Sequence, residues 1–367
     1  SGPLLRLAYF RLGTHQPGRL LIIAHHLVVD GISWRILLED LETAYARTSR
    51  GGRVELPAKT ASYREAAQRL RDFAASAEAA RDAAYWLGAQ RLRVPDLPVD
   101  FAQGENSVAT AQTLSVTLDQ EETTSLLQQL PRAYQTQIND ALLTALALAC
   151  QPWTGSPVLL VDVEGHGRHE EIFGDLELLR TVGWLTAIYP VILDTSGEAE
   201  PSQALRTVKE QLRQVPGHGI AYGALFHAAE GSSPLRADLR ALPRAQISFN
   251  YLGQLDQTLS ELSPFRPAPE SSGLAQSRTQ PRSHLLGLTA GVLGGEMILS
   301  WTYSDRLHRR ATIQRLAGRF LEALRHLIAQ SGQAAEEPCV PADFPLLAGL
   351  GQEQLDRIIS QVSEFQD

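Results

Sequence analysis

The sequence predicts an α/β protein in which strands and helices alternate along the chain. Short apolar stretches bounded by glycine are typical of strands, whereas longer stretches with apolar residues three or four positions apart are typical of helices. The 367 residues are 44% hydrophobic and 20% charged, an ordinary globular composition in a chain long enough for about two domains. Alternation of this kind predicts helices layered on a sheet.

The first part of the chain carries two expected strands and two expected helices. The strands are residues 4–12 and 20–26, on either side of a loop that begins and ends with glycine. Ser33 is expected to cap the first helix, and the glycine pair at 51–52 ends it. An alanine-rich helix is expected over residues 62–88. The proline-containing segment after it is expected to cross between two lobes.

The rest of the chain repeats the alternation. Strands are expected at residues 113–118, 158–163, 187–193, 246–251, 285–292 and 297–303. Helices are expected near residues 120–130, 136–150, 204–213 and 309–330. Gly294 and Gly295 predict a tight hairpin between the last two strands.

Charge and cysteine content argue against several classes of protein. The net charge of -8 gives only weak overall electrostatic support for binding nucleic acid, and a local basic face stays an alternative. Cys150 and Cys339 lie far apart, so we expect neither a disulfide framework nor a thiolate metal site, and we expect a reducing, cytoplasmic location. No apolar stretch reaches the length of a membrane span. The chain starts without a signal-peptide pattern or an initiator Met, and we interpret it as cut from a longer polypeptide.

Two adjacent histidines are the first candidates for chemistry. His25 and His26 are followed closely by Asp30 and Gly31. Adjacent side chains on a strand point to opposite faces, so one histidine is expected to face an open site while the other is buried and hydrogen-bonded. No further ligands stand at metal-site spacing, so we expect no metal. Asp30 suits either a helix cap or a buried ion pair, and an ordinary core pair remains an equal alternative for the two histidines.

Three further motifs place polar groups beside expected strands. The segment EGHGR at residues 164–168 joins a carboxylate, an imidazole and a guanidinium, and its glycines let the backbone approach another group closely. Residues 180–190 hold Trp184 at the entry to a strand, and residues 249–254 carry Asn and Tyr at the end of one. Each motif alone is also typical of an ordinary structural loop.

Together and in this order, the motifs resemble those of the epimerization domains of nonribosomal peptide synthetases. Residues 25–34 resemble the family's histidine motif HHxxxDGxSW, and residues 164–168 match EGHGR. The other matches are a helix motif at 139–147, RTVGWFTxxYP at 180–190 with Leu185 in place of Phe, PxxGxGYG at 216–223 and FNYLGQ at 249–254.

The sequence departs from the family pattern at two places. His169 stands where the family has an acidic residue directly after EGHGR. The family's opening motif, which is similar to PIQxWF, does not occur. The second departure predicts that this domain lacks its N-terminal segment.

The resemblance implies a fold and its division along the chain. The family has two lobes, each similar to chloramphenicol acetyltransferase, arranged in a V with the site at their junction. The first lobe would be residues 1–95 and incomplete, followed by a linker at 96–112. The second lobe would be residues 113–345, and residues 346–367 would form a tail or a linker.

The resemblance also implies an activity and partners. Such domains invert the α-carbon of an L-aminoacyl or L-peptidyl thioester on the phosphopantetheine arm of a carrier protein, which gives a D/L mixture. The expected partners are the carrier protein and other synthetase domains (adenylation and downstream condensation), with no cofactor bound by the domain itself and no nucleic acid or membrane. Two alternatives are a condensation domain that forms a peptide bond and an inactive carrier-binding remnant.

Residue roles follow from the same resemblance. Catalytic roles fall on His26, Glu164 and Tyr251. Structural support falls on His25, Asp30 and Arg168. Gly31, Trp184 and Asn250 are candidates for the substrate tunnel. Asp30 and Arg168 are expected to pair across the lobe interface, so the exchange Asp30→Arg with Arg168→Asp is expected to recover folding that each single change loses.

Overall fold

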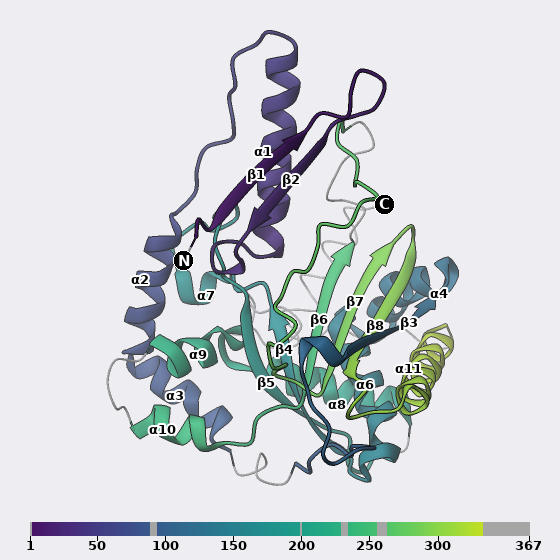
Figure 1. Cartoon of the computed structure of the whole chain (residues 1–367). Helices are drawn as coiled ribbons and strands as arrows, with labels where there is room; N and C mark the ends of the chain where they lie inside the picture. Colours follow the sequence, from purple (N-terminus) through teal and green to yellow (C-terminus); the bar gives the residue numbers. More distant parts are fainter. Residues whose placement is uncertain (1, 89–93, 199, 229–233, 255–262, 333–367) are drawn as a thin grey trace, which may run out of the picture.

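Two sheets organise the computed structural model, which describes residues 2–88, 94–198, 200–228, 234–254 and 263–332. A two-stranded hairpin belongs to the first lobe, and a six-stranded sheet forms the centre of the second (Figure 1). The α/β class with two lobes is therefore confirmed.

The six-stranded sheet is formed by segments from the whole second half of the chain. Its order is β3 (Ala111–Leu118), β8 (Glu296–Ser304), β7 (Leu286–Leu293), β6 (Ile247–Gln254), β4 (Val158–Gly165) and β5 (Ala187–Asp194). β6 runs parallel to both of its neighbours, and the other pairs are antiparallel. All six expected strands are confirmed. Gly294 and Gly295 form the two-residue turn between β7 and β8, both with positive φ, as a hairpin of this length requires.

Three long helices cover one face of this sheet (Figure 1). They are α6 (Ile138–Thr154), α8 (Pro201–Arg213) and α11 (Arg310–Ser331). The apolar residues of α11 recur every three or four positions and are buried: Leu316, Phe320, Leu324 and Leu327. Helical spacing in the sequence therefore identified the side of α11 that contacts the sheet.

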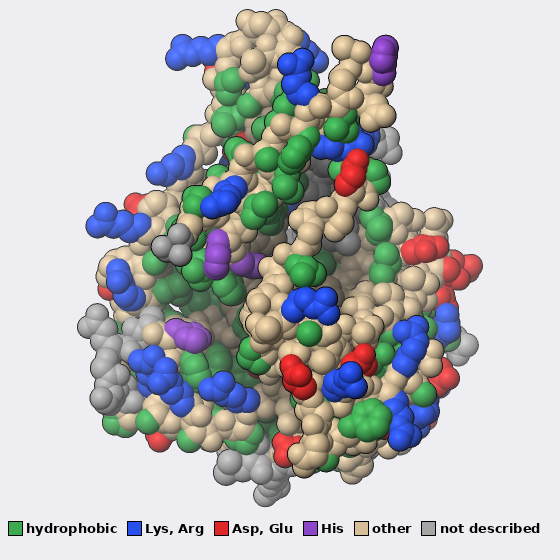
Figure 2. All heavy atoms as spheres, in the orientation of Figure 1, with side chains coloured by type: hydrophobic (Ala, Val, Ile, Leu, Met, Phe, Trp, Pro, Cys, Tyr) green, Lys and Arg blue, Asp and Glu red, His purple; other side chains and the backbone are tan. Residues whose placement is uncertain are grey.

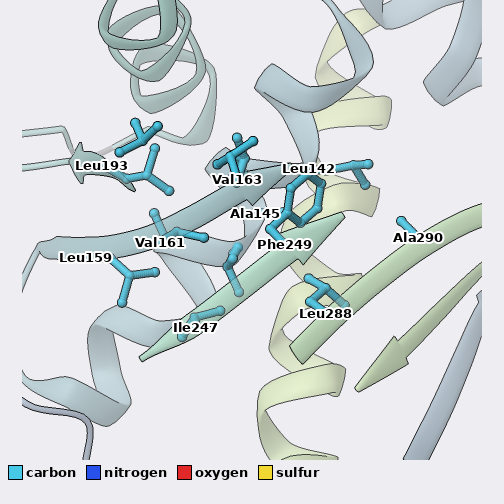
Figure 3. Close-up of a cluster of buried hydrophobic side chains, with 14 of the residues drawn as sticks. Leu142, Ala145, Leu159, Val161, Val163, Leu193, Ile247, Phe249, Leu288 and Ala290 are labelled. Atoms are coloured by element: carbon cyan, nitrogen blue, oxygen red, sulfur yellow. The ribbon is translucent and has the colours of Figure 1, made fainter. Parts of the chain in front are cut away.

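The two faces of the sheet differ in chemistry. Val161, Val163 and Phe249 point toward α6 and form part of the main hydrophobic core (Figure 3). Because side chains alternate along a strand, Asp162 and Glu164 lie on the opposite face, away from the long helices. This second face is therefore the one that carries the candidate chemistry.

The first lobe begins with β1 (Leu5–Phe10) and β2 (Arg19–Ala24), which pair in antiparallel register, and continues with α1 (Gly31–Ser49). Apolar side chains are exposed along this hairpin (Figure 2). The second strand ends before the histidines, which corrects its expected extent of 20–26. His26 to Val28 form a short 3-10 turn instead.

The cap of α1 also differs from the expectation. Asp30, and not Ser33, is the N-cap, and its carboxylate accepts a hydrogen bond from the Ser33 N–H at 2.8 Å. Both residue types cap helices well, so the sequence could not decide between them.

The alanine-rich segment forms two helices where one was expected. They are α2 (Tyr63–Ala74) and α3 (Ala77–Trp86), and Ser76 caps the second by accepting a hydrogen bond from the Ala79 N–H at 3.1 Å. Trp86 lies in the same buried cluster as the six-stranded sheet. The division of the chain into residues 1–95, 96–112, 113–345 and 346–367 stays a prediction, and the last of these segments lies outside the described residues.

The remaining helices are short. They are α4 (Gln120–Thr124), α5 (Leu130–Tyr134), α7 (Glu170–Phe173), α9 (Ile220–Gly223) and α10 (Pro234–Ala241). A π-helical turn over Ser125–Gln129 joins α4 to α5, so the helix expected near 120–130 is confirmed in an irregular form. Elements as short as α7 and α9 span too few turns to show a helical period. Among the described helices, none has the length and apolar character of a membrane span.

Candidate active site

A buried ion pair joins the two lobes at the start of α1. Arg168 donates from Nη1 to Asp30 Oδ2 at 2.8 Å and from Nη2 to Asp30 Oδ1 at 3.1 Å. The two side chains are only 3% and 1% exposed. The predicted pair is therefore present, and Asp30 fills both roles left open for it, because it also caps α1.

The Asp30 carboxylate has further donors. The Ser33 hydroxyl donates to Oδ1 at 2.7 Å, and the Leu185 N–H donates to Oδ2 at 3.0 Å. Burial acts to raise the pKa of Asp30, but the hydrogen bonds from Arg168 and Ser33 outweigh it, so that the pKa lies below its usual value. The carboxylate is therefore held ionised while buried, as a buried charge requires.

Two loops of the second lobe close around this pair. Arg168 Nη2 also donates to the Thr181 carbonyl at 3.0 Å, and the Gly183 N–H donates to the Ser33 hydroxyl at 3.0 Å. Gly167 has a φ of 66°, and a Cβ there would lie 1.6 Å from the Leu185 carbonyl oxygen. The second glycine of EGHGR is therefore needed for both its backbone angle and its close approach.

Other polar contacts tie α1 to the second lobe. Arg180 pairs with Glu39 at 2.9 Å and also with Asp40. Arg35 donates to the Leu252 carbonyl at 3.1 Å. The orientation of α1 against the second lobe thus depends on Arg180, the first residue of the motif at 180–190, and on side chains of α1 that lie outside the motifs.

The two histidines lie on a turn rather than on a strand. His25 and His26 are both exposed, and the Leu27 N–H donates to His25 Nδ1 at 3.1 Å. The expectation of one buried histidine is wrong, because the chain leaves β2 at Ala24 and strand alternation no longer applies. The His26 ring lies against the half-buried Trp184, with 4.8 Å between ring centroids. Histidine side chains are visible at the surface where the first lobe meets the second (Figure 2).

Glu164 stands at the end of β4 on the face opposite the long helices. It is half-buried, and Asn250 on the neighbouring strand β6 donates from Nδ2 to its Oε2 at 2.7 Å. Burial raises the pKa of Glu164, and the nearby His26, His284 and Asn250 offset this only in part. The structure therefore brings His26, Glu164, Trp184 and Asn250 to one junction from four separate segments.

Two predicted site residues have a different placement. Tyr251 follows Asn250 on β6, so alternation turns it to the face of Phe249, away from Glu164. It is half-buried, and burial raises its pKa. Gly31 is the first residue of α1, and a Cβ there would meet open space. Catalysis by Tyr251 and a tunnel position for Gly31 stay predictions.

Sequence reasoning missed one polar pair and one stack of histidine rings. His284 Nε2 lies 2.8 Å from Asp162 Oδ2, on the same face of β4 as Glu164. Asp162 could have been found from strand alternation, whereas no sequence signal pointed to His284. The rings of His166, His169 and His218 also stack, at 4.2 and 3.9 Å between centroids. Stacked rings do not converge on a point, and the described residues contain no group of three side chains arranged as metal ligands.

Comparisons with known proteins show the family of this chain. The family model for the condensation domain matches residues 1–344. A linear gramicidin synthase of Brevibacillus parabrevis is 48% identical over 332 residues, which is 90% of this chain and 4% of that protein. Chondramide synthase cmdD of Chondromyces crocatus is 46% identical over 374 residues, which is 100% of this chain and 9% of that protein. The chain thus spans less than a tenth of the length of these relatives.

Solved structures show the same fold. The crystal structure of the epimerization domain from the third module of tyrocidine synthetase B has a TM-score of 0.80 and 35% identity, and it covers 90% of this chain and 72% of that one. The first condensation domain of the CDA synthetase has a TM-score of 0.59 at 19% identity, with 92% and 69% covered. The second likeness concerns the fold alone. On the match over residues 1–344, this chain belongs to the condensation-domain family.

Proposed function

We propose that this chain is an epimerization domain of a nonribosomal peptide synthetase. Its substrate is an L-aminoacyl or L-peptidyl thioester on the phosphopantetheine arm of a carrier protein, and its product is the D/L mixture. One observation carries the proposal. Glu164 is half-buried at the lobe junction, burial raises the pKa of its carboxyl group, and His26 lies near enough to lower that pKa in part. The identity of 35% with a solved epimerization domain supports it.

The reaction needs two proton-transfer groups. One removes the proton from Cα, the thioester carbonyl takes up the negative charge as an enolate, and the other group returns a proton to the opposite face. The imidazole ring of His26 carries nitrogens that can accept or donate a proton, so it suits either transfer. A carboxyl group with a raised pKa is better suited to hold a proton than an ordinary Glu. Either group can be the base, since the reaction runs in both directions.

The surroundings of Glu164 suit this role. The Asn250 amide fixes one carboxyl oxygen at 2.7 Å, which orients the group. The buried Asp30–Arg168 pair holds the loop after Glu164 against α1 and the turn that carries His26. Two groups on different lobes therefore keep a set separation, which proton transfer at one carbon requires.

A condensation domain is the second candidate, because the matching family model is that of the condensation domain. Condensation joins the thioester to the amine of a second loaded carrier, and needs no proton donor on the opposite face of Cα. Loss of the Glu164 carboxyl would then leave most of the activity. The two candidates therefore differ in their dependence on one side chain.

The test uses the full polypeptide that carries this sequence, with the carrier protein loaded with an L-aminoacyl or L-peptidyl group. The thioester is hydrolysed, and the D:L ratio is read by chiral chromatography. We expect the wild type to form D product and both His26→Ala and Glu164→Gln to lose about 10²–10⁴-fold in rate. Glu296→Gln, at an exposed position of β8, is the matched control and keeps the wild-type rate.

Two outcomes contradict the proposal. The first is the absence of D product from folded, wild-type protein with either substrate length. The second is amide formation with an added loaded acceptor that survives Glu164→Gln, which identifies a condensation domain. Adenylation and downstream condensation domains are proposed as neighbours in the same assembly, and the domain needs no cofactor of its own beyond the carrier-bound arm.

A further inference from the structure

Inversion by two groups leaves the enzyme in a changed protonation state. In each turnover the base gains the proton from the broken Cα–H bond, and the acid loses the proton that forms the new one. The next L substrate therefore requires that the acid regain a proton and that the base lose one. His26 is exposed and can exchange its proton with solvent, but Glu164 is half-buried and hydrogen-bonded to Asn250.

A series of side chains that can exchange protons leads from the surface toward Glu164. Ser283 is exposed, and its Oγ lies 2.9 Å from His284 Nδ1. His284 Nε2 lies 2.8 Å from Asp162 Oδ2. Asp162 stands two residues before Glu164 on the same face of β4, about 6.6 Å away along the strand. This spacing is too long for direct transfer between the two carboxyl groups, but a single bridging water can carry a proton across it.

The backbone that carries the His284 imidazole is fixed in place. Asn106 Nδ2 donates to the His284 carbonyl at 3.0 Å and to the Arg282 carbonyl at 3.2 Å. The Arg282 guanidinium points away, to the Thr302 carbonyl at 2.9 Å. Among the described residues, the acidic groups beside the His284 ring are Asp162, which lies at hydrogen-bond distance, and Glu164, whose pKa His284 affects. The two ring nitrogens connect one carboxylate to one surface hydroxyl, which is the geometry of a proton carrier.

We infer that Asp162 and His284 form a proton relay that resets Glu164 between turnovers. The inference rests on the proposed epimerization. When Glu164 has given up its proton, protonated His284 passes one from Nε2 to Asp162, and Asp162 passes one through a bridging water to Glu164. His284 then takes a proton from solvent past the Ser283 hydroxyl. When Glu164 is the base, the same transfers run outward. His284 and Asp162 are positioning residues, since neither touches the substrate carbon.

The relay predicts a defect confined to repeated turnover. The test compares the first turnover, with enzyme in excess over loaded carrier protein, with steady turnover under a large excess of loaded carrier. We expect His284→Gln and Asp162→Asn to keep the first-turnover rate within about twofold and to slow later turnovers about tenfold or more, so that D product appears as a burst. Added imidazole is expected to restore steady turnover to His284→Ala. His326→Gln, at an exposed position of α11, is the matched control and shows no burst.

Two outcomes overturn the relay, and a third overturns the proposed function on which it rests. A folded His284→Gln protein that turns over steadily at the wild-type rate shows that the pair is not needed for reset. An equal loss in the first and later turnovers, without rescue by imidazole, shows that the pair only holds the segment before β7 against β4. Wild-type protein that forms no D product contradicts the proposed epimerization itself, and this result is distinct from the other two.

Discussion

At the scale of single residues, the surroundings of Glu164 decide its chemistry. Its carboxyl group lies on the sheet face opposite the long helices, accepts a hydrogen bond from Asn250 and lies in the field of His26 and His284. The largest effect on its pKa is burial, which favours the protonated form. The same carboxyl in an exposed loop would be ionised at neutral pH and would be a poor proton donor.

This burial predicts a link between acidity and stability. The pKa of Glu164 is raised above its ordinary value of 4.5, so the folded state binds its proton more tightly than the unfolded state. The resulting stability is complete below pH 4.5 and is lost as the pH rises through the folded pKa. We expect Glu164→Gln, which does not ionise, to raise the urea midpoint at about pH 7 and to leave it unchanged at about pH 4.

Equilibrium unfolding by urea at the two pH values tests this expectation. Glu296→Gln, whose carboxyl is exposed, serves as the control and should shift neither midpoint. A Glu164→Gln protein that is no more stable than the wild type at the higher pH would show that the carboxyl is not destabilised by its burial.

At the scale of elements, the EGHGR loop depends on one glycine. Gly167 has a φ of 66°, and a Cβ there would lie 1.6 Å from the Leu185 carbonyl. Gly155, at the C-terminal end of α6, has a similar φ of 70° but open space around it. A side chain at Gly155 would meet only the strain of a left-handed backbone, whereas a side chain at Gly167 would also overlap with another segment.

Alanine substitutions at Gly155 and Gly167 are therefore expected to differ in how much stability they remove. Gly155→Ala is expected to lose about 1 kcal/mol, which is typical of a non-glycine residue held at positive φ. Gly167→Ala has to displace the 181–185 segment from Asp30 as well, so we expect a larger loss of stability together with a loss of epimerization. Thermal unfolding and the D:L assay measure both, and equal effects of the two substitutions would contradict the close approach.

At the scale of the whole molecule, the two lobes are held together by ion pairs of unequal burial. The Arg168–Asp30 pair is almost fully buried, whereas Arg180 pairs with Glu39, whose side chain is 62% exposed. Removing one partner of a buried pair leaves an uncompensated charge and costs about 3–5 kcal/mol. An exposed pair contributes about 0.2–1 kcal/mol and is weakened by salt.

Arg168→Ala is therefore expected to unfold at a much lower urea concentration than Arg180→Ala. Only the Arg180→Ala effect should diminish in high salt. The exchange Asp30→Arg with Arg168→Asp is expected to recover only part of the loss, because Asp30 also caps α1 and accepts from Ser33 and Leu185. Full recovery by the exchange would show that the charge pair alone matters at this position.

Much of the fold could be read from periodicity, since helical and strand spacing reflect which side chains are buried. The six strands of the large sheet and the long helix α11 lie where the spacing predicts them. The predicted helix and strand boundaries that were wrong are those that depend on competing caps and turns. Asp30 and Ser33 are both good caps, Ser76 splits an alanine-rich helix, and β2 ends at Ala24 rather than at the histidines.

By itself, the sequence determined the α/β class, the order of the elements and the motifs that resemble the epimerization family. Only the tertiary structure decided that Asp30 caps and pairs at once, that both histidines are exposed, that Tyr251 turns away from Glu164 and that His284 reaches Asp162. Local spacing reports which face of an element is buried. Contacts between residues more than a hundred positions apart depend on how the lobes and strands pack, and no local pattern encodes that packing.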